Sequence, residues 1–193
     1  MKKAYRVAFL LAAVFLLSGC GQKFEPTEST LFVNSKGKVR SAVIESFEQD
    51  YYDFEELSGE VKERISEYCL TMEGEPITLE SIEKGEQEVT LFLTYETVED
   101  YCTFNDLLLF SGTFAEAKAA GYIPTELQSP EGEAVAVDSV ELNDLKVIVT
   151  EESIAIQTAG KIKYMSDNVT FIDKKLARAL EAGVAHPAFV LYK

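Results

Sequence analysis

The sequence predicts an α+β fold in which antiparallel β-hairpins pack on one long amphipathic helix, followed by a β-rich C-terminal meander. Apolar residues recur every three or four positions over residues 54–72, which is typical of an amphipathic helix. Short β-rich runs flank this helix, and six more follow it in the second half of the chain. With 193 residues, of which 47% are hydrophobic, the composition is that of a globular protein.

The first half of the chain predicts two hairpins and three helices. The Asn34–Gly37 turn separates two β-rich runs, and Asp53 with Glu56 has the spacing of a capping box at the start of the long helix. Gly59 weakens the interior of that helix. Thr97 and Thr113 begin two shorter helices, the second of which ends at Gly121. The strands are expected at 30–33, 39–47, 77–82 and 88–95.

The second half predicts an antiparallel meander, because short β-rich runs alternate with turn residues. Its strands are expected at 134–142, 146–150, 153–157, 161–165, 169–172 and 189–192. Residues 173–183 are rich in Ala, Leu and Lys, and we expect a helix there, although the run also continues the preceding strand. Two prolines and a glycine in residues 124–133 indicate a sub-boundary.

The first twenty residues have the features of an export signal. Lys2, Lys3 and Arg6 precede an apolar run over 7–17 that is too short to span a bilayer. The run ends in Leu17-Ser18-Gly19-Cys20, which resembles the lipobox of bacterial prolipoproteins. This resemblance implies that residues 1–19 form a signal peptide and that Cys20 carries diacylglyceryl and further acyl (palmitate) chains. An ordinary secretory signal with an incidental cysteine is the alternative.

Residues 20–29 contain Pro26 and no apolar period, so we expect a tether there and a single extracytoplasmic domain over 30–193. The body also resembles lipoproteins of anaerobic Gram-positive bacteria that have no assigned activity. The stretches that carry this resemblance are Tyr51–Asp53, Thr94–Asn105, Leu109–Tyr122 and Lys161–Asn168. It implies the cell envelope as location and implies no chemistry.

The net charge of −15 excludes nucleic acid as a partner, because the field repels phosphates. Three of the 18 basic residues lie in the leader, so the mature chain would be more acidic still. His186 is the single histidine, and the chain has no Gly-x-Ser-x-Gly elbow, His-Glu-x-x-His helix, Cys-x-x-Cys pair or phosphate-binding loop. We therefore predict no catalytic residue and no cofactor beyond the lipid on Cys20.

An acidic and aromatic segment, residues 45–56 (ESFEQDYYDFEE), is the strongest candidate for binding. Its side chains suit a solvated helix start with aromatic rings in the core, or a site for calcium or a cationic ligand. Glu48, Asp50 and Asp53 are the metal-ligand candidates, although their spacing does not match an EF-hand.

Cys69 and Cys102 would leave the reducing cytosol on export, and a disulfide between them would contribute about 3–4 kcal/mol. Both also fall at apolar positions of predicted helices, so two separate buried thiols are the alternative.

These features favour a lipoprotein on the extracytoplasmic face of the cell membrane. We expect a non-catalytic binding or accessory protein of the envelope, with the membrane and either an envelope protein or a small ligand as partners. One alternative is a cell-wall hydrolase that uses paired carboxylates, for which the mark would be two convergent carboxylates in a pocket, one with a raised pKa. Another is a subunit of a secretion or transport machine, with a large exposed apolar patch.

Overall fold

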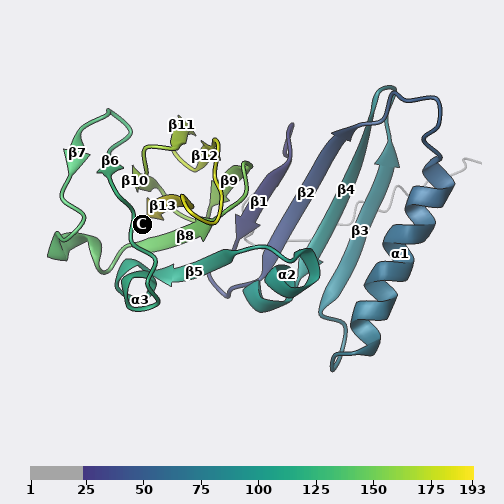
Figure 1. Cartoon of the computed structure of the whole chain (residues 1–193), viewed down its shortest axis with the longest axis horizontal. Coiled ribbons are helices and arrows are strands. Elements are labelled where there is room, and N and C mark those ends of the chain that lie inside the picture. Colours follow the sequence, from purple (N-terminus) through teal and green to yellow (C-terminus); the bar gives the residue numbers. More distant parts are fainter. Residues whose placement is uncertain (1–23) are drawn as a thin grey trace, which may run out of the picture.

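The computed structural model describes residues 24–193, in which strands form two sheets (Figure 1). The first sheet, sheet A, has the order β11-β12-β9-β1-β2-β4-β3. The second, sheet B, has the order β5-β8-β13-β10-β6-β7. Sheet A contains β1 (Thr30–Val33), β2 (Val39–Ser46), β3 (Ile77–Lys84), β4 (Glu88–Tyr95), β9 (Ala155–Thr158), β11 (Val169–Asp173) and β12 (Leu176–Ala179). Sheet B contains β5 (Leu109–Thr113), β6 (Leu127–Gln128), β7 (Ala134–Val135), β8 (Lys146–Thr150), β10 (Ile162–Met165) and β13 (Ala188–Tyr192).

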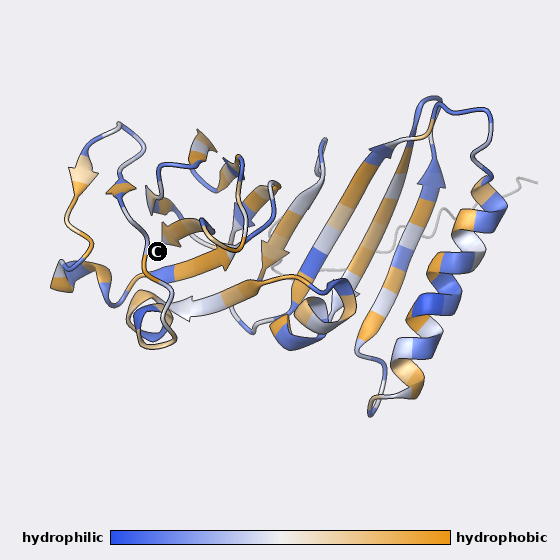
Figure 2. Cartoon of the chain, viewed as in Figure 1, coloured by the Kyte–Doolittle hydropathy of each residue, from blue (hydrophilic) through white to orange (hydrophobic). Residues whose placement is uncertain are grey.

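Three α-helices accompany the sheets in the described part of the chain. They are α1 (Phe54–Leu70), α2 (Val98–Asn105) and α3 (Phe114–Ala119), with one 3₁₀ turn over Val140–Leu142. Helix α1 lies along the β3 side of sheet A (Figure 1). Figure 2 shows β8 and β13 as mostly hydrophobic strands, whereas hydrophilic residues dominate α1.

The predicted fold class is wrong. The described part of the chain is β-rich, with 39% of its residues in strands and 20% in helices, and no set of hairpins in it is organised on one long helix. The long helix exists, but it covers only one side of sheet A. The second half of the chain also forms no separate meander, because β9, β11 and β12 extend sheet A while the other strands build sheet B.

The link between the two halves of the chain is a parallel pair. Thr30 pairs with Ala155 and Val33 with Thr158, so the first strand joins the ninth side by side. Val33 and Ile156 are both fully buried. Sheet A is therefore completed by residues from both ends of the described chain.

Residues 173–183 form a strand and turns in place of the expected helix. The amide of Lys175 donates to the Asp173 carboxylate, which closes a turn between β11 and β12. Ala177 and Ala179 then alternate into the core and are fully buried. Pairing with β9 and β11 thus outweighs the intrinsic helix propensity of the segment. The predicted strand 134–142 is also shorter, since it contains only the two-residue β7 and the 3₁₀ turn.

Local signals correctly predicted the helix starts. The Asp53 carboxylate accepts from the amides of Glu55 and Glu56 at the start of α1. Full capping boxes begin α2 at Thr97 and α3 at Thr113. Both predicted hairpins of the first half are present as well, β1 with β2 and β3 with β4.

We expect Gly59→Ala to raise the free energy of unfolding by about 0.5–1 kcal/mol, because alanine loses less backbone entropy in a helix. A methyl group at this position would meet nothing within 4 Å. Chemical denaturation of both proteins measures the effect. Gly37→Ala is the contrasting variant, because Gly37 has a φ of +82° and alanine there is expected to be destabilising.

Candidate functional site

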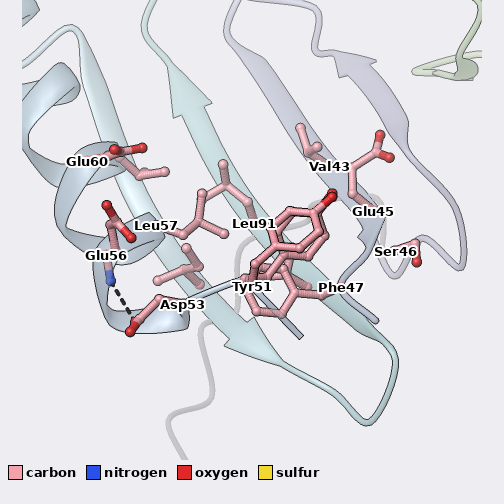
Figure 3. A pocket seen from close by; sticks show the side chains of 14 residues that line it. Val43, Glu45, Ser46, Phe47, Tyr51, Asp53, Glu56, Leu57, Glu60 and Leu91 are labelled. Atoms are coloured by element: carbon pink, nitrogen blue, oxygen red, sulfur yellow. Dashed lines mark hydrogen bonds between the residues drawn. The ribbon is translucent and has the colours of Figure 1, made fainter. Parts of the chain in front are cut away.

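A groove of about 510 Å³ lies between the first half of α1 and the face of sheet A formed by β2, β3 and β4 (Figure 3). Three kinds of side chain line it. Its apolar lining is Val43, Leu57, Val61, Ile82, Val89 and Leu91, its aromatic residues are Phe47, Tyr51 and Tyr52, and its carboxylates are Glu45, Asp53, Glu56 and Glu60. The volume is in the range of sites for small organic molecules.

The loop between β2 and α1 supplies the aromatic residues. The Phe47 amide donates to the Gln87 carbonyl at 2.8 Å, which fixes the start of the loop beside the β3–β4 turn. The Tyr52 amide donates to the Gln49 carbonyl at 3.0 Å, so the chain turns just before α1 begins. These bonds hold both tyrosines beside the groove.

The three rings contact one another and remain accessible. Phe47 and Tyr52 stack with ring centroids 5.0 Å apart, and Tyr51 meets Tyr52 edge-on at 4.8 Å. Tyr51 is 77% exposed and Tyr52 is 42% exposed, so both rings are open to solvent. The neighbouring Tyr51 hydroxyl raises the pKa of Tyr52. Lys84 Nζ lies 5.2 Å from the Phe47 centroid, so a cation already occupies one approach to this cluster.

The arrangement suits a cationic ligand with an apolar body. The faces of aromatic rings attract cations, and carboxylates on both the sheet and helix sides of the groove add a negative potential. The aliphatic lining would bury the apolar part of such a ligand. The expected core role of the aromatic residues in 45–56 is therefore wrong for Tyr51 and Tyr52, which are exposed.

The metal-ligand candidates do not converge. Asp53 lines the groove, but one of its carboxylate oxygens accepts the two amides at the start of α1. Glu48 and Asp50 are exposed residues of the loop. Within residues 24–193, no group of three or more His, Cys, Asp or Glu side chains is placed to hold a metal ion.

Cys20 lies outside the described residues, whereas Cys69 and Cys102 are free thiols in the structure. Both are half-buried beside the core of sheet A. The Cys102 thiol donates to the Leu109 carbonyl at 3.3 Å, and burial raises the pKa of Cys102. A disulfide between the two thiols stays a prediction, and thiol titration in denaturant with and without reductant checks it.

Sequence reasoning missed a hydrogen-bonded pair formed by the buried Tyr101 of α2 and the half-buried Glu152 of the β8–β9 loop. The Tyr101 hydroxyl donates to the Glu152 carboxylate, and Tyr101 is only 2% exposed. Desolvation raises the pKa of Glu152, and the charge of Glu151 adds to this effect. Desolvation and the facing Glu152 also raise the pKa of Tyr101. Glu151 and Glu152 fall between two predicted strands, 146–150 and 153–157, and nothing near them in the sequence indicates a distant tyrosine.

We expect Glu152→Gln to stabilise the protein at neutral pH, by an amount of the order of 1 kcal/mol. Folding raises the pKa of Glu152, so the folded state favours its protonated form. The stabilising contribution of this group is fully present below its unfolded pKa of about 4.3, and it is lost as the pH rises through the pKa of the folded state. The variant and the parent should therefore have equal stability in acid and diverge as the pH rises. Denaturation curves at several pH values measure this, with the exposed Glu83→Gln as control. A difference in stability between the variant and the parent that stays constant with pH would contradict the raised pKa of Glu152.

The hydrolase alternative predicts a pocket that holds two convergent carboxylates, one of them with a raised pKa. Glu152 has a raised pKa, but it is not among the residues that line the groove. Within residues 24–193, no helix is long and apolar enough to cross a membrane.

Comparisons of the chain with protein-family models, with curated proteins and with solved structures find no match.

Proposed function

We propose that the chain is an extracytoplasmic lipoprotein, held on the cell membrane by acyl chains on Cys20, with a non-catalytic binding role. We infer further that its ligand is an organic cation with an apolar body and that the ligand occupies the groove between α1 and sheet A. The lipobox-like residues 17–20 support the anchor, and the acidic, aromatic groove supports the ligand class.

One observation carries the ligand assignment: two exposed tyrosine rings stand beside four carboxylates and an aliphatic lining. A folded protein gains stability from burying such rings, so their exposure indicates a surface kept for a partner. A cation over an aromatic face is stabilised by about 0.5–2 kcal/mol, and an equally apolar neutral molecule gains none of this.

Calorimetric titration of the mature protein with phenethylammonium and with 2-phenylethanol tests the ligand class. The two probes share the aromatic body and differ in charge. We expect the ammonium probe to bind about tenfold or more tightly than the alcohol, with an advantage that shrinks at high salt. Equal affinity for both probes would overturn the cationic assignment.

Variants locate the site. Tyr52→Ala and the pair Glu56→Gln with Glu60→Gln should each weaken the ammonium probe by about tenfold, which corresponds to roughly 1.4 kcal/mol. Glu63→Gln is the matched control, because Glu63 is an exposed residue of α1 that does not line the groove. If the control loses as much affinity as the pair, the probe binds by general charge attraction and the groove is not its site.

Mass spectrometry of protein extracted from membranes tests the anchor. We expect an N-terminal residue that corresponds to Cys20 and carries diacylglyceryl and acyl mass, and we expect Cys20→Ala to abolish that mass. A mature protein that begins elsewhere, or an unmodified Cys20, would contradict the anchor without bearing on the groove.

A further inference from the structure

The segment that begins at Phe24 is packed against the outer face of sheet A, the face turned away from α1. Phe24 is 8% exposed and lies between Phe32 and Phe92, with ring centroids 6.1 and 6.3 Å away. The Arg40 guanidinium lies 4.8 Å from the centroid of the Phe24 ring. Phe24, which falls within the expected tether of residues 20–29, is therefore part of the packed body.

The rest of the segment is also held. Arg178 Nε donates to Glu28 at 2.7 Å, and Ser29 Oγ accepts from the Ile44 amide at 2.8 Å. Because Phe24 lies near the start of β2 and Ser29 near its end, the segment runs along β2. Phe24, the first described residue, thus lies at the end of sheet A where β1 turns into β2.

The connection from this point to Cys20 is short. Four residue steps separate Cys20 from Phe24, and a fully extended chain spans at most about 3.6 Å per residue, or roughly 14 Å in total. A lipid on Cys20 would therefore hold this end of sheet A close to the bilayer surface.

Basic side chains gather at the same end. Val33 pairs with Thr158, which brings the β1–β2 turn beside the crossing from β9 to β10. The Lys161 amide donates to the Lys193 carbonyl at 2.7 Å, and the Ile162 amide donates to the Lys174 carbonyl at 2.8 Å. We call this region the basic end, formed by Lys36, Lys38, Arg40, Lys161, Lys174 and Lys193. Its acidic neighbours include Glu25, Glu96, Glu131, Glu133 and Asp173, of which Glu96 pairs with Lys38 at 2.6 Å. Two further lysines, Lys163 and Lys175, lie among them, so basic groups are in excess over these neighbours.

The groove lies at the opposite end of β2. This strand runs from Val39 at the basic end to Ser46 at the groove, which at about 3.3 Å per residue is roughly 25 Å (Figure 1). Acidic residues dominate there, and Lys62 and Lys84 are basic residues of the same end. The acidic residues are Glu45, Glu48, Asp50, Asp53, Glu55, Glu56, Glu60, Glu83, Glu86 and Glu88. The separation exceeds the Debye length of about 8 Å, so a surface charge at one end acts little on the other.

We propose that the basic end rests on anionic lipid headgroups and that the groove faces away from the membrane. This orientation rests on the proposed lipid anchor at Cys20. The short connection brings the basic end to the surface, attraction to anionic headgroups holds it there, and the acidic groove end is repelled. The groove is thereby presented to ligands outside the cell.

Lysine footprinting of the lipidated mature protein tests the orientation. The protein is reconstituted in phosphatidylcholine vesicles with and without phosphatidylglycerol, labelled with an amine-reactive ester and digested for mass spectrometry. With phosphatidylglycerol we expect labelling of Lys36, Lys161 and Lys174 to fall about threefold or more, and that of Lys62 and Lys84 to stay within about twofold. High salt should remove the difference.

A charge variant and a matched control sharpen this test. Lys161→Gln with Lys174→Gln should reduce the protection of Lys36, whereas Lys62→Gln with Lys84→Gln should leave it unchanged. Anchored protein with equal labelling changes at both ends, or with stronger protection of Lys62 and Lys84, would overturn the orientation alone. Protein that does not float with vesicles and has an unmodified N-terminus would overturn the anchor and the orientation together.

Discussion

Phe189→Ala is expected to lower the free energy of unfolding by about 3–5 kcal/mol. Phe189 lies in β13, an inner strand of sheet B, and is 1% exposed. It belongs to the same buried cluster as Phe114, Leu142 and Val149. Removing its ring leaves a cavity among side chains held by two neighbouring strands and α3, so the surrounding structure can close in only partly. Urea denaturation of both proteins measures the loss.

Val184→Ala is the control for this substitution. Val184 is 82% exposed, and its truncation should change the free energy of unfolding by no more than about 0.5 kcal/mol. Similar losses in the free energy of unfolding for both variants would show that Phe189 is not part of a packed core on sheet B.

Gly160→Ala should destabilise the protein by about 3 kcal/mol, at the upper end of what overpacking usually costs. A methyl group on residue 160 would overlap the backbone carbonyl of Lys193. That carbonyl accepts from the Lys161 amide at 2.7 Å, and the Lys193 amide donates back to Lys161 at 3.0 Å. The clash therefore separates the end of β13 from the start of β10, and thermal or urea denaturation detects it.

Gly183→Ala separates this effect from that of losing a glycine anywhere. An added methyl group at 183 would meet nothing within 4 Å, and its φ is not positive. We expect a change within about 1 kcal/mol of the parent. A Gly160→Ala protein as stable as the Gly183→Ala protein would contradict the close approach of the two chain segments.

The parts of the fold that the sequence predicts are those determined within a few residues. The capping residues Asp53, Thr97 and Thr113 act on amides two or three positions away, so their effect is readable directly. The hairpin of β3 and β4 likewise depends on a nearby turn and on alternating apolar residues.

The fold class was not readable because it depends on pairing between distant segments. Nothing in the alternation of β1 shows that its second neighbour is β9 or that the pair is parallel. Residues 176–179 show the same limit, since their alanines fit a helix by propensity and a strand only through their neighbours β9 and β11. Once these strands enter sheet A, a separate C-terminal meander cannot form.

Half of the candidate site was predictable. The acidic and aromatic loop stands out by composition, and its tyrosines and Asp53 do line the groove. The aliphatic lining comes from β2, β3, β4 and the inner side of α1, so it exists only once the helix lies on the sheet. The Tyr101–Glu152 pair was unpredictable for a similar reason, since the partners come from α2 and from a loop between sheets.

The parallel pairing of β1 with β9 sets the order in which the molecule can mature. Because a chain is synthesised N-terminus first, β1 is available long before β9, and the edge of β1 that pairs with β9 stays open until most of the protein has emerged. Contacts of such long sequence separation slow folding. The finished fold should consequently appear in one late step, and a chain that stops before β9 should remain without the completed sheet and be open to proteases.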